Sequence, residues 1–285
     1  FSSSVYLFTE AIINYANDDV KKEILPKLVS GEVIGTLAVA EDLQAPTAEN
    51  ISLLSDNNIL NGKKIAVPDA EIATHAIVVA KTSSGISLQL VDLNADGVKI
   101  EKQENIDESR GYFSILFENS PSKLIGDETG GWDLYEALMN QAAVLFGYEQ
   151  IGGSQAALDM AINYSKERYA FGRQIGSFQA IKHKLADMYI SLTLARSNCY
   201  FGAWALGNDA PELPVAAATA RVSATKAFYE CSKENIQTHG GMGATWEFDC
   251  HLFYRRARLL SANIGGQSLW KDKLVSSIER SNLPQ

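Results

Sequence analysis

The chain is short of the residues that most often build metal centres and disulfide frameworks. It has 285 residues but only three cysteines and four histidines. Cys199, Cys231 and Cys250 match no zinc-ligand spacing, and an odd number of cysteines does not favour a disulfide framework. The histidines are scattered, and none shows the spacing of a zinc-binding helix. We therefore expect no metal site, and the cysteine usage favours a reducing, cytoplasmic location.

Positive charge and long apolar runs are also scarce. The 25 basic and 34 acidic residues give a net charge of −9, which argues against non-specific binding to nucleic acids or anionic membranes. No apolar run is long enough to span a membrane, and the first residues lack the basic region of a secretory signal. The remaining composition is that of an ordinary globular protein with two or three domains. A phosphate-bearing ligand would therefore need local basic clusters.

Three regions with different residue patterns predict an α+β multidomain fold. Residues 1–33 read as helical, with Asn17-Asp18 as a helix N-cap and Gly31 as the helix end. Residues 34–127 contain short apolar runs separated by turn signals, which suggest a β-barrel or sandwich. Asn61-Gly62 is the strongest local cue for a hairpin turn. Strands are expected at 34–40, 59–67, 76–80, 86–91 and 112–117.

From about residue 131 the pattern becomes helical. Pro211 and Pro214 mark a break between the second and third of four helices, which are expected at 132–166, 178–206, 213–239 and 246–260. Four long helices joined by short connections favour a bundle. The predicted domains are N-terminal helices at 1–33, a central β-barrel at 34–127 and a C-terminal four-helix bundle at 128–285.

Two motifs at the edges of these helices are suited to holding an anion. Arg168 and Arg173 lie close to Phe171, so fixed positive charge stands beside an aromatic face on which a purine can lie. Further along, Gly240-Gly241 lets backbone N–H groups approach a ligand without an intervening side chain. The simpler alternatives are a surface salt bridge for Arg168 and a helix C-cap for the two glycines.

Together, segments 167–180 and 237–243 resemble the C-terminal domain of the acyl-CoA dehydrogenases, FAD enzymes that oxidise the Cα–Cβ bond of an acyl-CoA thioester. The resemblance continues through 185–188 and 255–258 and extends more weakly over most of the chain. It implies helices, a barrel and a helical bundle in that order, with residues 1–33 as a remnant of a larger N-terminal helical domain. The chain is then either a shortened member or one that lacks preceding residues.

In this family each FAD is shared between two subunits, and the resemblance assigns one set of residues to the neighbouring subunit's cofactor. By motif position, Arg168 should meet the pyrophosphate and Phe171 should pack near the adenine. Gln179 should bond the ribose or adenine end. Gln237 should line the other side of the groove with the Gly240-Gly241 backbone. The alternative for the two glutamines is ordinary helix-surface polarity.

The same resemblance identifies a second set of residues, which face a subunit's own flavin, and several of these are replaced in this chain. Ala40 stands where the family has a threonine that bonds the flavin, and Ala66-Val67-Pro68 replaces a Trp-Ile-Thr that packs on the ring. The two usual positions of the catalytic glutamate hold Ile264 and Ala142, and neither residue can accept a proton. Glu149 is the nearest carboxylate on the helix of Ala142, and a paired or solvated role suits it better.

The sequence therefore predicts a base-lacking acyl-CoA dehydrogenase subunit that completes the FAD site of a catalytic partner. The assembly is a hetero-oligomer or a homotetramer acting in fatty-acid or steroid side-chain degradation. One alternative is a complete enzyme with an unusual base at Glu41, Asp42 or Glu149. Others are a flavin monooxygenase or oxidase on the same fold and a cofactor-free paralogue. Small residues such as Gly147 and Gly153 fit either a bulky acyl group or close helix packing.

Overall fold

The computed structural model describes residues 1–282, with side chains described through Arg280, and it separates into two compact units. Unit 1 spans Phe1–Met139, and unit 2 begins at Asn140. The three-part division at residues 33 and 127 stays a prediction. Among the described helices, none combines the length and apolar character that crossing a lipid bilayer requires.

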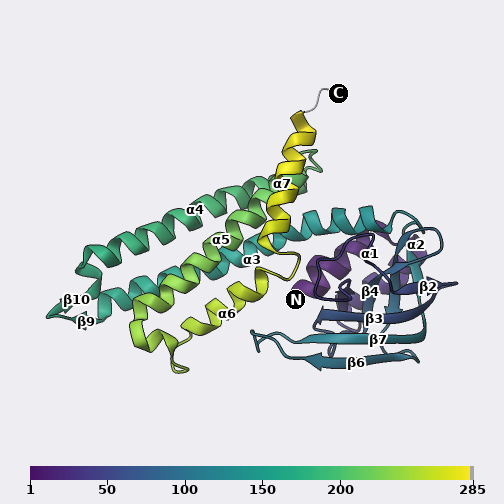
Figure 1. The fold of residues 1–285 in the computed structure, drawn as a ribbon, viewed down its shortest axis with the longest axis horizontal. Helices are drawn as coiled ribbons and strands as arrows, with labels where there is room; N and C mark the ends of the chain where they lie inside the picture. The colour runs from purple at the N-terminus through teal and green to yellow at the C-terminus, as the bar shows by residue number, and fades with distance from the viewer. Residues whose placement is uncertain (283–285) are drawn as a thin grey trace. The chain divides into compact units, whose positions relative to one another are not determined.

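Unit 1 begins with helices and continues as a sheet (Figure 1). Its helices are a π-helix at Ser3–Thr9, α1 at Glu10–Tyr15 and α2 at Asp18–Ser30. Its strands are β1 Gly35–Ala38, β2 Leu54–Asp56, β3 Ile59–Pro68, β4 His75–Lys81, β5 Ile86–Asp92, β6 Val98–Gln103, β7 Tyr112–Pro121 and β8 Lys123–Ile125.

The ends of α2 confirm the predicted cap and stop. The Asn17 side chain accepts a hydrogen bond from the backbone N–H of Val20 at 2.9 Å. Gly31 ends the helix at φ 79°, a left-handed conformation that glycine adopts without a steric penalty. The π-helix packs on the sheet through the fully buried ring of Phe8, which lies where a Cβ on Gly35 would be.

The sheet follows the order β6-β7-β3-β2-β4-β5-β8, with β1 pairing in parallel with β4. The expected β-domain is confirmed, but a closed barrel is not found, because no described pairing joins β6 to β8. The strands β4 and β5 are buried on both faces, which explains their continuous apolar runs.

The hairpin predicted at Asn61-Gly62 is wrong. Strand β3 runs straight through these residues, with a bulge between Leu60 and Asn61. The turn lies four residues earlier, at Asn57-Asn58, which connects β2 to β3. Both residues have positive φ, 49° and 61°. Asparagine tolerates this conformation, so the Asn-Asn pair supplies the turn chemistry instead.

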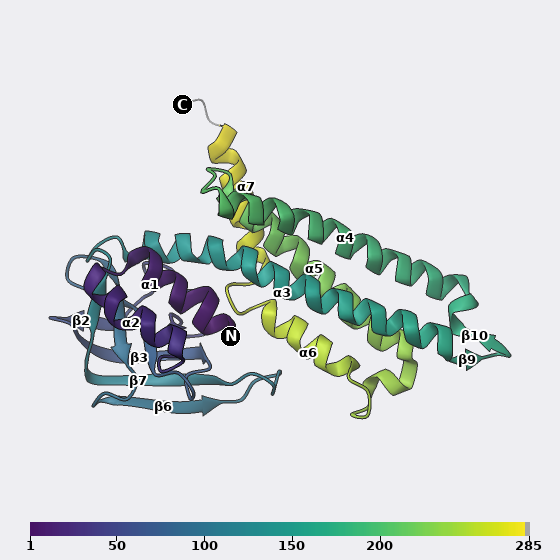
Figure 2. The ribbon, with the colours of Figure 1, turned by 180° about the vertical axis from the view of Figure 1, so that it is seen from behind.

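Unit 2 is a helical bundle in which α5 packs against α4, α6 and α7, as Figures 1 and 2 both show. The helix α7 was not predicted, and the last expected helix starts later than 246. The elements from α3 onward are α3 Gly131–Glu167, β9 Tyr169–Ala170, β10 Arg173–Gln174, a 3₁₀ turn Ile175–Ser177, α4 Gln179–Gly207, α5 Leu213–His239, a 3₁₀ turn Gly240–Ala244, α6 Cys250–Leu260 and α7 Gln267–Asn282.

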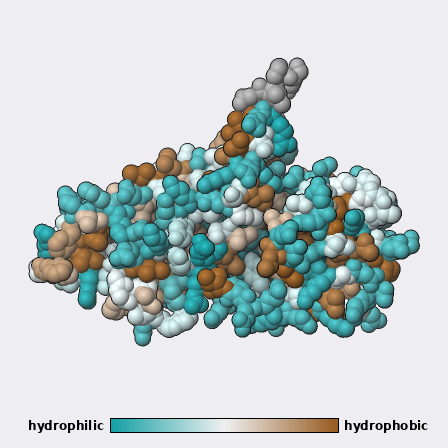
Figure 3. Space-filling model, viewed as in Figure 1, coloured by the Kyte–Doolittle hydropathy of each residue, from teal (hydrophilic) through white to brown (hydrophobic). Residues whose placement is uncertain are grey.

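One face of α4 is apolar and exposed. Figure 3 shows brown patches along the edge of unit 2 where α4 runs. Several large apolar side chains exposed on the same helix can mark an interaction surface. Its members, here called the α4 apolar face, are Tyr189, Ile190, Leu194, Tyr200, Phe201 and Trp204.

Candidate functional site

The structure brings the two sequence motifs together at one end of unit 2. A hollow of about 500 Å³ is bordered by Arg168 from the first motif and by Gly240 and Gly241 from the second. Its remaining lining residues are Tyr164, Ile175, Thr238, His239, Met242 and Thr245. Side chains and backbone amides from segments far apart in the sequence therefore face one space.

Arg168 reaches this hollow because α3 ends one residue earlier, at Glu167. The Ile175 N–H donates to the Arg168 carbonyl at 2.9 Å, which closes the β9–β10 hairpin behind it. Within residues 1–282 no carboxylate forms an ion pair with Arg168, so the expected alternative of a salt bridge with Glu167 or Asp187 is not observed. The guanidinium is left available to a ligand.

The two glycines keep the opposite wall free of side chains. Gly240 ends α5 at φ 61°, and a Cβ on either Gly240 or Gly241 would meet no atom within 4 Å. An added side chain would therefore project into open space beside the backbone amides. Gly240 is the C-cap of α5, as the simpler alternative expected, and its N–H donates to the Gln237 carbonyl. Backbone without covering side chains next to an arginine that has no ion pair among the described residues suits an anionic group.

The other expected cofactor residues do not border this hollow. Phe171 sits at the tip of the β9–β10 hairpin at φ 54°, with 95% of its surface exposed. Gln179 is the first residue of α4, and Gln237 lies in the last turn of α5; both are exposed. Their cofactor roles stay predictions. Arg173 instead lies over the Phe178 ring at 4.0 Å, a cation–π contact.

Two aromatic residues that the motifs did not single out form the floor of the hollow. Tyr164 and His239 stack with ring centroids 4.0 Å apart, and both border the opening. The signal for Tyr164 is its place four residues before Arg168, whose N–H donates to the Tyr164 carbonyl at 2.9 Å. His239 is adjacent to the two glycines and was taken only as one of four scattered histidines.

The two positions expected to lack a base are both buried and apolar. Ala142 is fully enclosed in α3, and Ile264 is 7% exposed. The Ile264 carbonyl accepts a hydrogen bond from Trp270 Nε1 at 2.9 Å. The preceding turn is held by Arg221, which is 1% exposed and donates to the Leu260 carbonyl and to Asn263 Oδ1. This loop is fixed by interior contacts and carries no carboxylate.

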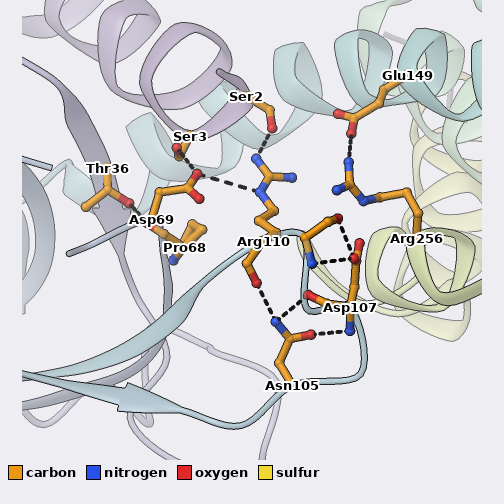
Figure 4. Close-up of polar contacts among 11 residues, drawn as sticks. Ser2, Ser3, Thr36, Pro68, Asp69, Asn105, Asp107, Arg110, Glu149 and Arg256 are labelled. Atoms are coloured by element: carbon orange, nitrogen blue, oxygen red, sulfur yellow. Dashed lines mark hydrogen bonds and ion pairs between the residues drawn. The ribbon is translucent and has the colours of Figure 1, made fainter. Parts of the chain in front are cut away.

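Glu149, which lies two helical turns after Ala142 on α3, is paired. Its Oε1 lies 3.2 Å from Arg256 Nη1 in a half-buried ion pair, drawn in Figure 4. The alternative of a paired helix glutamate is therefore the arrangement observed. To accept a proton from a substrate, Glu149 would have to give up this contact with Arg256.

In unit 1, two of the three residues that replace the Trp-Ile-Thr motif offer no free N–H. The Ala66 N–H donates to Gln103 Oε1 at 2.8 Å, and Pro68 has no N–H. The Pro68 carbonyl accepts from Thr36 Oγ1 at 2.6 Å, as Figure 4 shows. The Ala40 carbonyl accepts the Ile65 N–H at 2.8 Å. Each of these groups is bonded to another residue of unit 1, so none of them is a free donor for a flavin ring edge.

Next to Pro68, Asp69 closes the same edge of unit 1. Asp69 Oδ2 accepts from Ser3 Oγ at 2.6 Å and lies 3.6 Å from Arg110 Nε. Arg110 also donates to Ser2, so the first helical residues are tied to the loop before β7 (Figure 4). Asp107 and Asn105 fold that loop onto itself.

Glu41, one of the alternative bases, is fully occupied. Its carboxylate accepts from Lys64 Nζ at 2.7 Å, from the Ser52 N–H at 2.8 Å and from the Leu53 N–H at 3.0 Å. Burial acts to raise the pKa of Glu41, but the hydrogen bonds outweigh it and leave the pKa below its usual value. Lys64 is fully buried, and that burial lowers its pKa to about 8 against the opposing effect of Glu41.

The small residues of α3 serve helix packing. A Cβ on Gly147 would lie 3.1 Å from Cys199 Sγ, and one on Gly153 would lie 2.5 Å from the Phe228 ring. The neighbouring helices α4 and α5 thus occupy the space that a bulky acyl group would need at these positions. Within residues 1–282 no three histidine, cysteine, aspartate or glutamate side chains gather as a metal site requires.

Comparison with known proteins decides the family. The family model described as "Acyl-CoA dehydrogenase, C-terminal domain" matches residues 129–268. Acyl-CoA dehydrogenase IpdE2 of Mycolicibacterium smegmatis is 32% identical over 247 residues, which cover 82% of this chain and 73% of the relative. This chain belongs to the acyl-CoA dehydrogenase family. The protein of the same name from Mycobacterium tuberculosis is 43% identical over 122 residues, 42% of this chain and 36% of that protein.

Solved acyl-CoA dehydrogenases share the fold. Butyryl-CoA dehydrogenase from Megasphaera elsdenii matches with a TM-score of 0.93 at 23% identity, over 98% of this chain and 76% of that one. A structure described as the "Tcur3481-Tcur3483 steroid ACAD G363A variant" matches with a TM-score of 0.87 at 24% identity, over 98% and 76% of the two chains. Acyl-CoA dehydrogenases are FAD-dependent oxidoreductases that act on CH–CH bonds.

Proposed function

We propose that this chain is a base-lacking subunit of an acyl-CoA dehydrogenase, and that it completes the FAD site of a catalytic partner subunit. The observation that carries the proposal is the hollow in unit 2. Among the described residues the Arg168 side chain forms no ion pair, and the Gly240 and Gly241 backbones border the hollow without a covering side chain. A guanidinium beside uncovered backbone fits the pyrophosphate of a dinucleotide.

In the proposed role, each group of the hollow has a defined task. Arg168 holds the pyrophosphate with a fixed charge, and the glycine backbone lets the phosphate oxygens approach. Phe171 offers an exposed ring for the adenine, and Gln179 and Gln237 offer amides to the ribose or adenine end. A flavin held there would supply the hydride acceptor for Cβ of the thioester, and the partner would have to supply the base for the α-proton. This chain contributes binding and orientation.

The face of unit 1 that would serve a flavin of its own does not fit that cofactor. Ala66 and Pro68 offer no free N–H, and Ala40 has no hydroxyl. Leaving a buried polar edge of a ligand unpaired costs about 1–3 kcal/mol per lost hydrogen bond. The absence of a carboxylate at Ile264 and Ala142 points the same way, because proton abstraction needs a basic group in reach.

A complete enzyme with an unusual base is less well supported. Glu41 is consumed by Lys64 and by two backbone N–H groups, and Glu149 is paired with Arg256. Both carboxylates would have to give up these contacts to accept a substrate proton.

Assembly with a second acyl-CoA dehydrogenase subunit is supported by the α4 apolar face. Its six large side chains are exposed in the isolated chain, and burying such side chains stabilises an assembly by about 25 cal/mol per Å² of apolar surface. A steroid-type acyl group is proposed for the assembly because one structural relative is described as a steroid enzyme. Gly147 and Gly153 give that substrate no support, since both serve helix packing.

Co-expression tests the proposal. The chain is purified alone and together with a candidate acyl-CoA dehydrogenase that carries a glutamate at either usual base position. The proposal expects FAD and acyl-CoA oxidation in the pair, with loss of FAD from the pair when Arg168 is changed to Ala. Stoichiometric FAD and turnover in the chain alone would overturn it.

A further inference from the structure

The hollow beside Arg168 contains one side chain to which the proposed function gives no task. His239 borders the hollow and is 4% exposed. Its ring stacks on Tyr164 at 4.0 Å with an interplanar angle of 26°, and the Phe248 ring lies 5.7 Å away on another side. Contacts with two aromatic rings fix the plane of the imidazole.

The hydrogen bond of His239 also fixes which nitrogen carries the proton. Nδ1 lies 2.9 Å from the backbone carbonyl oxygen of Asn235, one turn earlier in α5. A carbonyl oxygen can only accept, so Nδ1 must donate. In the neutral imidazole the other nitrogen, Nε2, is then an acceptor.

This acceptor is open to a ligand. Within the described part of the chain, Nε2 has no hydrogen-bond partner. Nε2 is also not fully enclosed by protein atoms, unlike the unbonded ring nitrogen Nε2 of His251. It therefore keeps access to solvent, and the hollow is the opening that the ring borders. The backbone of the next residue, Gly240, faces the same opening.

Nε2 is a hydrogen-bond acceptor, so it recognises a different ligand group from the one that the donor Arg168 recognises. The Arg168 guanidinium is a donor and matches phosphate oxygens, which only accept. The Gly240 N–H already donates to the Gln237 carbonyl. Nε2 needs a donor, and the donors attached next to a dinucleotide pyrophosphate are sugar hydroxyls. We propose that His239 Nε2 accepts a hydrogen bond from such a hydroxyl and thereby recognises the sugar beside the phosphates. This inference rests on the function proposed above.

Binding of ADP, 2′-deoxy-ADP and 3′-deoxy-ADP to the full chain tests the ribose as the source of the hydroxyl. Titrations are run at about pH 8, where an ordinary imidazole is neutral. Wild type should lose roughly three- to tenfold in affinity for one deoxy compound, the loss of one hydrogen bond. His239→Phe keeps a ring stacked on Tyr164 but has no acceptor. It should therefore bind ADP more weakly than wild type by the same factor, and it should bind ADP and that deoxy compound equally well.

Two further variants control for folding. His239→Gln places an acceptor near the Nε2 position and should restore part of the discrimination. His251→Phe is the matched control, because His251 also bonds a backbone carbonyl through Nδ1 and packs on an aromatic ring, Trp246, yet does not border the hollow. It should bind like wild type.

The flavin-side sugar is tested with FAD binding to the co-purified pair of this chain and its catalytic partner. If the three ADP compounds bind alike but His239→Phe weakens FAD, the hydroxyl belongs to the ribityl chain and the inference stands. Equal binding of every ligand by wild type and His239→Phe would overturn it, provided that Arg168→Ala weakens ADP. If ADP binds neither wild type nor Arg168→Ala, the proposed function fails, and this inference falls with it.

Discussion

Two groups of polar residues, one in each unit, differ in whether their members are already bonded. In unit 1, Glu41, Lys64, Asp69 and Arg110 bond one another or nearby groups, and Ala66 and Pro68 have no free N–H. At the hollow of unit 2, Arg168 forms no ion pair within the described residues and lies beside glycine backbone without covering side chains. Groups that are consumed internally stabilise the fold, and groups that stay open can bind a ligand. The contrast indicates which unit kept a ligand site.

The largest effect is expected from Glu41→Ala. This change leaves Lys64 as a fully buried, unpaired cation and should lower the free energy of unfolding by about 3 kcal/mol. FAD affinity of the assembly should stay within about twofold, since Glu41 serves only the fold. Denaturant titration and FAD binding check the two halves. A large loss of FAD in a folded variant would break the contrast between the units.

Arg168→Ala should show the reverse pattern. Loss of a charged hydrogen-bond partner costs about 1.5–3 kcal/mol, which weakens FAD binding by about 10- to 100-fold. The thermal midpoint without ligand should not move, because Arg168 is exposed and has no ion pair within the described residues. Arg168→Lys is the control, because it keeps the charge but loses the planar fork of the guanidinium. Its FAD affinity should lie between those of wild type and Arg168→Ala.

Acid should act on unit 1 through Glu41. Its folded pKa lies below the usual 4.5, so the stabilisation by its ionised carboxylate is complete above that pH and is lost as pH falls through the folded value. Stability measured by denaturant should therefore decline as pH drops below about 4.5. The decline should be shallower in Glu41→Gln. Equal slopes would show that the contacts of this carboxylate do not depend on its charge.

The smallest effect is expected from Ile264→Val. Removing one buried methylene group costs about 0.5–1.5 kcal/mol of stability. Turnover of the assembly should stay within about twofold, because the partner supplies the base. Steady-state kinetics at saturating acyl-CoA checks this. A loss of turnover far beyond that range, with normal FAD content, would mean that this loop takes part in the chemistry.

Much of the fold could be predicted from local signals. The helix ends at Asn17 and Gly31 follow from capping chemistry, and the long helices follow from apolar periodicity. The prediction of a hairpin turn at Asn61-Gly62 was wrong because the turn lies at Asn57-Asn58, where both residues have the required positive φ values. Strands such as β6, with alternating exposed charges, and the short β8 gain their stability from pairing, which no local pattern records.

The site was predicted only in part for a similar reason. Arg168, Gly240 and Gly241 stand out as residue types, and the structure places them around one hollow. His239 reads as an ordinary histidine until its Nδ1 bond and its stacking on Tyr164 are known. The cytoplasmic location stays a prediction, although the three cysteines are free and buried as the sequence led us to expect for Cys199.

The structure of the assembled enzyme with FAD bound tests the central claim most directly. The account predicts Arg168 of this chain against the pyrophosphate of a flavin whose ring lies on the partner subunit, with the partner's carboxylate at the thioester α-carbon. FAD lying wholly on unit 1 of this chain, with one of its own carboxylates in that place, would contradict it.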